Sequence, residues 1–254
     1  MSGETMGWKR TELKGGRVSG RADRWRLALS PQDRGYANAQ LDDYQGATFR
    51  WGKGTRFAAR ARFSAEADAL VGTAGFGFWN APFGPGTGSR IRLPRAVWFF
   101  YASSASDLPL APLGQQGNGW FAATIDAHTL RALRWTPLIV PVLVLNQFYA
   151  LRRFLWPLIR RDLHISFERL TVSMRAWHTY EIEWRDEQTI FLVDGAPVLV
   201  TPRSVGGSMG FVTWIDNQAM VLTPRGKVWW KTEPVEQPQW LEIEGLITSR
   251  LSEE

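Results

Sequence analysis

The chain contains no cysteine in its 254 residues. Disulfides and thiol chemistry are therefore excluded, and this usage fits a reducing cytoplasm. Histidine is also scarce: His128, His164 and His178 are far apart and show none of the spacings typical of zinc ligands. The sequence also has no P-loop and no dinucleotide-binding fingerprint. We therefore expect neither a metal nor a cofactor.

Long apolar runs are absent as well. Residues 137–151 form a run of fifteen in which only Asn146 and Gln147 are strongly polar, and a membrane-spanning helix needs about 20 residues. The first sixteen residues, MSGETMGWKRTELKGG, lack the apolar core of a signal peptide. These features predict a cytoplasmic protein without a signal peptide, with peripheral membrane association as an alternative.

The positive charge is concentrated in one segment. Residues 130–175 hold eight arginines against Asp162 and Glu168, a surplus equal to the whole net charge of +6. Nucleic-acid-binding proteins usually spread such charge over a face and carry a recognisable motif. No such motif is present, so nucleic acid is not an expected partner.

Most of the chain predicts short β-strands. In residues 56–64, Phe57, Ala59, Ala61 and Phe63 alternate with arginines and Ala58, which is typical of a half-buried strand. Residues 179–184, 188–193 and 196–200 follow as a strand series with an Asp194-Gly195 turn. Further strands are expected at 74–80, 95–106, 209–215 and 240–247. This spacing favours an all-β sandwich, barrel or jelly roll.

Residues 129–165 interrupt the strand pattern and predict a helical insertion, which Pro141 and Pro157 divide into short helices. The insertion has three interpretations: a lid packed on the sandwich, a cover that encloses an apolar pocket, or a membrane-surface element at residues 130–162. We expect a loosely ordered segment over residues 1–20 and a single domain over residues 21–254.

Two regions of the chain resemble glycoside hydrolase family 16, the laminarinase and lichenase group. Residues 54–80, GTRFAARARFS…GTAGFGFWN, are similar to its paired strands, and residues 177–198, WHTYEIEWRDEQTIFLVDGAPV, are similar to its Y-x-x-E-W…V-D-G segment. The resemblance covers roughly residues 36–105 and 176–247. It implies a concanavalin-like jelly roll of two antiparallel sheets.

The family's catalytic E-x-D-x-x-E strand has no counterpart here. Its expected position, residues 95–106, reads RAVWFFYASSAS and contains no acid. A retaining glycosidase needs two carboxyls about 5 Å apart. We therefore do not expect a standard retaining glycosidase, and whether any reaction is catalysed stays open. Either the row Trp98–Phe100 or the row Phe99–Tyr101 is expected to face the concave cleft.

The fourteen tryptophans fit either a wide sandwich core or an aromatic-lined cleft. We hypothesise a cleft that binds, and in one version converts, an apolar or aromatic small molecule. A carbohydrate-binding or carbohydrate-active protein with relocated carboxylates drawn from Asp42, Asp43, Asp126 and Asp216 is the alternative, and a peripheral membrane protein is the third. The candidate catalytic residues are Asp126, Asp216 and His128, and the candidate ligand-binding residues are Trp79, Trp98, Phe100, Tyr101, Trp120, Trp214 and Asn217.

Overall fold

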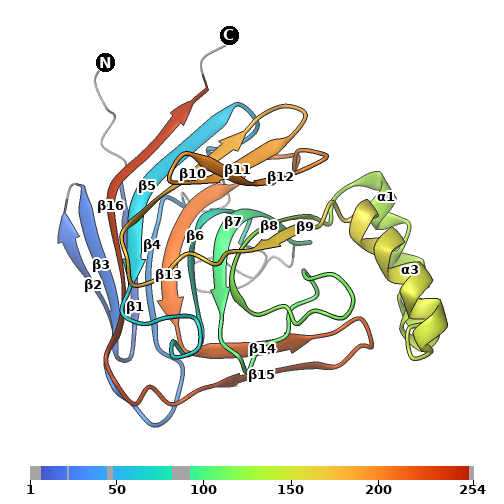
Figure 1. The fold of residues 1–254 in the computed structure, drawn as a ribbon, viewed down its shortest axis with the longest axis horizontal. Helices are drawn as coiled ribbons and strands as arrows, with labels where there is room; N and C mark the ends of the chain where they lie inside the picture. Colours follow the sequence, from blue (N-terminus) through green and yellow to red (C-terminus); the bar gives the residue numbers. More distant parts are fainter. Residues whose placement is uncertain (1–6, 22, 45–47, 82–91, 252–254) are drawn as a thin grey trace.

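The computed structural model describes residues 7–21, 23–44, 48–81 and 92–251. Two seven-stranded antiparallel sheets pack face to face, which confirms the predicted jelly-roll sandwich (Figure 1). The front sheet has the order β1 (Lys9–Leu13), β4 (Asn38–Asp42), β13 (Gly210–Asp216), β6 (Thr73–Trp79), β7 (Arg95–Ala102), β8 (Gly119–Asp126) and β9 (Ser166–Arg169).

The back sheet contains the predicted strand series and the long C-terminal strand. Its order is β12 (Ala196–Val200), β11 (Thr189–Val193), β10 (His178–Trp184), β5 (Thr55–Phe63), β16 (Gln239–Arg250), β3 (Arg24–Leu29) and β2 (Gly16–Arg21). A separate hairpin, β14 (Gln218–Leu222) and β15 (Val228–Thr232), runs beside the front sheet (Figure 1).

The core lies between the two sheets because each strand turns alternate side chains inward. Phe57, Phe76, Phe99 and Tyr180 meet there with ring centroids 5.0–5.8 Å apart. The predicted inward row of β5 is confirmed, since Phe57 and Phe63 are buried. A wide aromatic core therefore accounts for part of the tryptophan and phenylalanine content.

The outer face of the back sheet is charged. Glu242 on β16 pairs with Arg24, Arg26 and Arg62 at 3.7, 3.6 and 2.8 Å. Arg62 also lies over the rings of Trp177 and Trp240, 4.9 and 5.3 Å from their centroids. This Arg–Glu–Trp lattice shields the apolar part of the arginine stems and gives the back sheet a solvated surface.

Two strands occupy part of the N-terminal segment that was expected to be loosely ordered. Lys9–Leu13 pairs with β4, and Gly16–Arg21 pairs with β3, so the expectation is wrong for these residues. The reason is that both strands are held by neighbouring strands, while their own side chains are mostly exposed and show little apolar alternation.

The insertion is helical, as predicted, and consists of α1 (Leu130–Leu133), a 3-10 turn (Thr136–Leu138), α2 (Ile139–Leu145) and α3 (Tyr149–Asp162). The predicted breaks are wrong in position, because Pro141 lies in the first turn of α2 and Pro157 lies inside α3. The Thr129 hydroxyl accepts a hydrogen bond from Ala132 N and caps α1. In Figure 1 the helices lie beyond the β9 edge of the front sheet. None of the described helices is long and apolar enough to cross a membrane.

Candidate functional site

A pocket of about 290 Å³ lies on the outer face of the front sheet. Its floor comes from β4, β6, β7 and β13, whose outward-facing residues form a second hydrophobic cluster separate from the core. Its outer wall comes from the segment Leu108–Leu110 and from β14. The volume falls near the lower end of the range for small-molecule sites, so one small ligand fills it.

Aromatic rings line one end of this pocket. Trp98 packs on Trp79 at 4.5 Å between ring centroids, on Phe100 at 4.9 Å and on Trp214 at 5.8 Å. Trp98 and Phe100 belong to the outward row of β7, whereas Val97, Phe99 and Tyr101 belong to the core. The row Trp98–Phe100 is therefore the one that faces the pocket, and four of the seven predicted ligand-binding residues line it: Trp79, Trp98, Phe100 and Trp214.

Polar side chains line the other end and form one hydrogen-bonded chain. The Trp214 indole donates to the Thr73 hydroxyl at 3.0 Å, and that hydroxyl donates to Asp216 Oδ1 at 2.9 Å. Tyr36 donates its hydroxyl proton to Asp216 Oδ2 at 3.2 Å, and Asn38 Nδ2 donates to the Tyr36 oxygen at 3.1 Å. The network fixes the orientation of each polar group that borders the pocket.

Two polar atoms on pocket-lining residues have no hydrogen-bond partner within the described part of the chain. They are the Nε1 donor of Trp98 and the Oδ1 acceptor of Asn38, and both are buried. Buried polar groups in native proteins are nearly always paired. Both atoms are closed to solvent in this structure, so a ligand reaches them only when the lining side chains move.

Burial shifts the acidity of the carboxyl in this network. Desolvation raises the pKa of Asp216 to about 6, although hydrogen bonds from Gln218 N and from Thr73 act in the opposite direction. Burial, together with the negative charge of Asp216, also raises the pKa of Tyr36. Near neutral pH the Tyr36 hydroxyl therefore stays protonated and donates a hydrogen bond to the Asp216 carboxylate.

The raised pKa of Asp216 predicts a specific pH dependence of stability. Because the folded state holds this proton more tightly than the unfolded chain, its stabilising effect is complete below pH 4 and is lost as the pH rises through 6. The stability advantage of the wild type over Asp216→Asn should fall by up to about 3 kcal/mol between pH 4 and pH 7. Urea unfolding at each pH measures it, with Asp186→Asn as the exposed control; a constant difference would contradict the raised pKa.

Asp42 and Asp216, two of the carboxylates considered for catalysis, do not form a glycosidase pair. Asp42 pairs in register with Val212, four residues from Asp216 on β13, which separates the two carboxyls by about 13 Å along the strands. Retaining enzymes need about 5 Å and inverting enzymes about 6.5–9.5 Å. Among the described lining residues, Asp216 is the one carboxylic acid.

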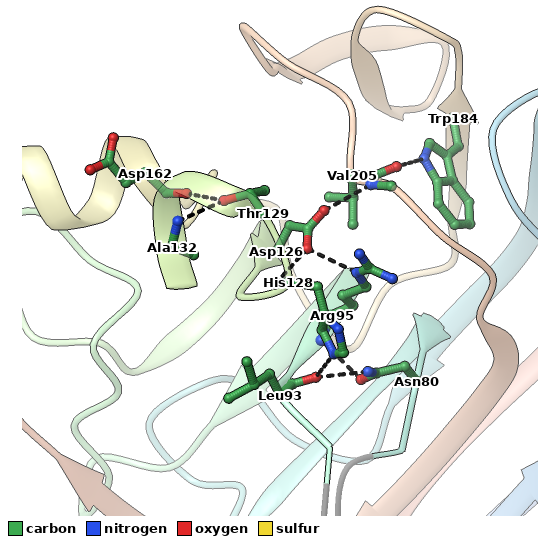
Figure 2. Close-up of polar contacts among 11 residues, drawn as sticks. Asn80, Leu93, Arg95, Asp126, His128, Thr129, Ala132, Asp162, Trp184 and Val205 are labelled. Carbon is green, nitrogen blue, oxygen red and sulfur yellow. Dashed lines mark hydrogen bonds and ion pairs between the residues drawn. The ribbon is translucent and has the colours of Figure 1, made fainter. Parts of the chain in front are cut away.

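Asp126 and His128 do not line the pocket. They belong to a separate group of polar contacts around Arg95 and Leu93, which Figure 2 shows. Asp126 pairs with Arg95 at 2.8 Å and accepts hydrogen bonds from Gly206 N at 2.9 Å and His128 N at 3.0 Å. The His128 ring contacts the Leu93 carbonyl at 2.7 Å. The prediction that they belong to the ligand site is wrong. Their contacts instead link the start of the insertion to β7 and to the loop at residue 206.

Three predicted ligand-binding residues also lie elsewhere. Tyr101 and Trp120 are directly opposite each other on β7 and β8 and both point into the core. Tyr101 donates its hydroxyl proton toward the carbonyls of Ala67 and Leu70. Asn217 is fully buried, where it accepts from Ala37 N and donates to the Gly35 and Glu233 carbonyls. All three stabilise the fold rather than border the pocket.

The insertion does not cover the pocket. No described residue of 129–165 lines it, and the outer wall is built instead by Leu108–Leu110 with Met220 and Leu222. A parallel bridge joins Asp107 to Val221, and Asp107 N donates to the Met220 carbonyl at 3.0 Å. The prediction of a helical cover is thus wrong in position, although the apolar lining that it was meant to enclose is present.

Sequence reasoning missed Tyr36, Asn38 and Gln40. A signal was available, because NAQLD places Asn38, Gln40 and Asp42 on one face of β4 and the core residues Ala39 and Leu41 on the other. A polar row at spacing two beside buried alanine and leucine is typical of a strand whose outer face carries function or solvent. The missing information was that β4 lies next to β13.

The fold and its outer-face pocket define a concanavalin-like jelly roll, and the sequence resemblance is confirmed. Residues 163–236 match the model of Glycosyl hydrolases family 16. This segment includes the Y-x-x-E-W…V-D-G strands and continues through β13 to the β14–β15 hairpin.

Solved structures show the same architecture. An endo-acting O-glycanase, of the kind that members of the human gut microbiota express to initiate mucin breakdown, is 11% identical with a TM-score of 0.53, covering 98% of this chain and 94% of the other. A native glycosidic hydrolase is 12% identical with a TM-score of 0.50, covering 98% and 92%. At these identities the likeness shows the fold alone. A comparison with curated protein sequences gives no match.

Proposed function

We propose that this protein binds a saccharide in the outer-face pocket without cleaving it by a two-carboxylate mechanism. The observation that carries the proposal is a lining that combines the rings of Trp98 and Trp214 with polar side chains such as Gln40 and Asp216. A sugar has an apolar C–H face and hydroxyls that both donate and accept hydrogen bonds, so one ligand class matches both parts of the lining.

The lining itself fits the two surfaces of a sugar ring. Trp98 and Trp214 offer apolar ring area to the C–H face, and Asn38, Gln40 and Asp216 offer hydrogen-bonding groups to the hydroxyls. The similarity of residues 163–236 to a glycoside hydrolase family, and the glycan-degrading activities named for the two solved structures, also favour a carbohydrate ligand.

An apolar or aromatic small molecule is the second candidate, because most of the lining consists of rings and aliphatic side chains. Such a ligand would cover polar side chains of the lining, among them Gln40 and Asp216, without offering them hydrogen bonds. Covering polar groups in this way costs free energy that a hydroxyl-bearing ligand avoids. The saccharide is therefore the better match to the same pocket.

Calorimetric titration with a panel of neutral and acidic oligosaccharides tests the proposal. We expect saturable binding to at least one glycan, no release of reducing ends, and at least a tenfold loss of affinity in Trp98→Ala, which corresponds to about 1.4 kcal/mol. Trp177→Ala is the matched control, since Trp177 lies against arginines of the back sheet.

A second variant separates the two ligand classes. Asn38→Leu removes the polar atoms at similar side-chain size, so it should weaken glycan binding and strengthen the binding of an apolar fluorescent probe such as anilinonaphthalene sulfonate. Absence of glycan binding across the panel, together with tight probe binding in the wild type that glycans do not displace, would overturn the saccharide assignment.

A further inference from the structure

The helical insertion exposes an unusual amount of apolar surface. Nine of the sixteen large hydrophobic side chains that are exposed in the described part of the chain fall between residues 130 and 154. Phe148 and Phe154 are 61% and 70% exposed, and Leu130 is 88% exposed. Scattered exposed hydrophobic residues are normal on soluble proteins, but a cluster of this kind marks an interaction surface.

Helix α3 is arranged to present this surface outward. Its buried positions, Trp156 and Ile159 among them, follow a helical spacing and face the rest of the protein. Phe154 and Leu151 lie among the exposed positions. The exposed ring of Phe154 is therefore carried by a helix whose opposite face is packed against the rest of the protein.

The same segment is strongly cationic. Residues 130–162 carry six arginines and a single acid, Asp162. That acid is buried and already paired with Arg134 and Arg161, and it accepts a hydrogen bond from the Trp135 indole at 2.9 Å. No acidic side chain of this segment is thus exposed to oppose the arginines at the surface.

The β14–β15 turn places further positive charge beside the insertion. Asn146 Nδ2 donates to the Pro224 carbonyl at 3.0 Å, and Gln147 Nε2 donates to the Arg225 carbonyl at 2.8 Å, which holds the β14–β15 turn against the junction of α2 and α3. The turn exposes Arg225 and Lys227. A groove of about 700 Å³ between α3, the residue 107–115 segment and this turn is lined by Arg152, Arg153, Arg225 and Lys227.

We infer that the insertion and the β14–β15 turn dock the protein on an anionic phospholipid bilayer. Exposed aromatic and aliphatic side chains enter the interface, and surrounding arginines contact lipid phosphates, as in interfacial amphipathic helices. A second copy of the chain is a poorer occupant, because it would bring two surfaces of the same positive sign together. No described residue of the insertion lines the saccharide pocket, but the two sites meet at Leu108 and Pro109, which border both the groove and the pocket.

Vesicle co-sedimentation of the full chain tests the inference. We expect binding to vesicles of phosphatidylcholine with 30% phosphatidylglycerol, much weaker binding to phosphatidylcholine alone, and release at high salt. Each exposed arginine replaced should weaken binding about fivefold, from roughly 1 kcal/mol per charge. Arg131→Gln and Arg153→Gln are suitable because both side chains are exposed.

The apolar contribution has its own matched pair of variants. Phe148→Ser with Phe154→Ser should reduce binding at least tenfold, whereas Val200→Ser with Ile247→Ser, which alters exposed apolar residues of the back sheet, should not. Equal binding to neutral and anionic vesicles, or no binding to either, would overturn the inference. Self-association in analytical ultracentrifugation that Phe148→Ser and Phe154→Ser abolish would assign the surface to a second copy instead.

Discussion

Replacing Trp120 with alanine should lower the free energy of unfolding by about 3–5 kcal/mol, the range for removing a large aromatic ring from a core. Trp120 is 1% exposed and packs edge-on against Phe63, Phe76 and Tyr180 at 5.1–5.7 Å between centroids. Its ring also stacks on Phe99 at 6.1 Å. Four aromatic neighbours would thus border the resulting cavity, and rings held by both sheets can close it only in part.

Denaturant unfolding followed by tryptophan fluorescence and circular dichroism measures this loss. Trp230→Ala is the control, because Trp230 is 68% exposed and its removal should change the unfolding free energy by no more than about 0.5 kcal/mol. A loss below 1 kcal/mol in Trp120→Ala would contradict the core assignment. Such a result would instead favour the prediction that the Trp120 ring borders the ligand site.

Gly75→Ala should destabilise the protein by about 2–3 kcal/mol and disturb the pocket floor at the same time. A Cβ at this position would lie 2.3 Å from the Phe99 carbonyl oxygen and 3.0 Å from Cη2 of Trp214. The first contact is with backbone, so β6 and β7 must separate locally. The second displaces the indole that donates to Thr73.

Thermal unfolding and glycan titration report the two effects of Gly75→Ala separately. Gly52→Ala is the matched control, since a Cβ there meets only the Gly207 carbonyl oxygen, at 3.4 Å. The expected outcome is a lower melting temperature and weaker ligand binding for Gly75→Ala alone. Unchanged stability would show that β6 and β7 tolerate a wider spacing than the structure has.

The sequence was sufficient for the fold because its local patterns agree with one another. Alternation in residues 56–64 and the Asp194-Gly195 turn predict strands that the structure contains as β5, β11 and β12. The absence of acidic residues from 95–106 is likewise evident from the sequence alone. What those positions present instead, the rings of Trp98 and Phe100, follows from alternation along a single strand.

The errors in the predicted site come from information that a strand pattern does not hold. Tyr101 could have been separated from Trp98 and Phe100, because neighbouring residues of one strand face opposite sides. To place Trp120 in the core, one must know that it pairs with Tyr101 on the neighbouring strand. To place Asp126 in an ion pair, one must know that it lies opposite Arg95. These are pairings between strands, and no local periodicity specifies them.

The insertion shows a second limit. Its helical character could be predicted from composition, but the helix boundaries do not fall at Pro141 or Pro157. The place of the helices depends on contacts such as that between Arg160 Nη2 and the Leu110 carbonyl at 2.9 Å. The pocket wall comes from two short apolar stretches, LPLAPL at residues 108–113 and AMVL at residues 219–222, and nothing in them specifies that they lie over the front sheet. Tertiary position decided which segment became the wall.

The Arg–Glu–Trp lattice of the back sheet has an unequal tolerance to substitution. Glu242 is shared by Arg24, Arg26 and Arg62, so loss of one of these arginines leaves the carboxylate with two partners. Loss of Glu242 removes the shared carboxylate from all three arginines of β3 and β5 at once, and among them Arg24 still pairs with Glu244, at 3.8 Å. We therefore expect substitutions of single arginines on this surface to be tolerated during evolution, whereas Glu242 should be retained.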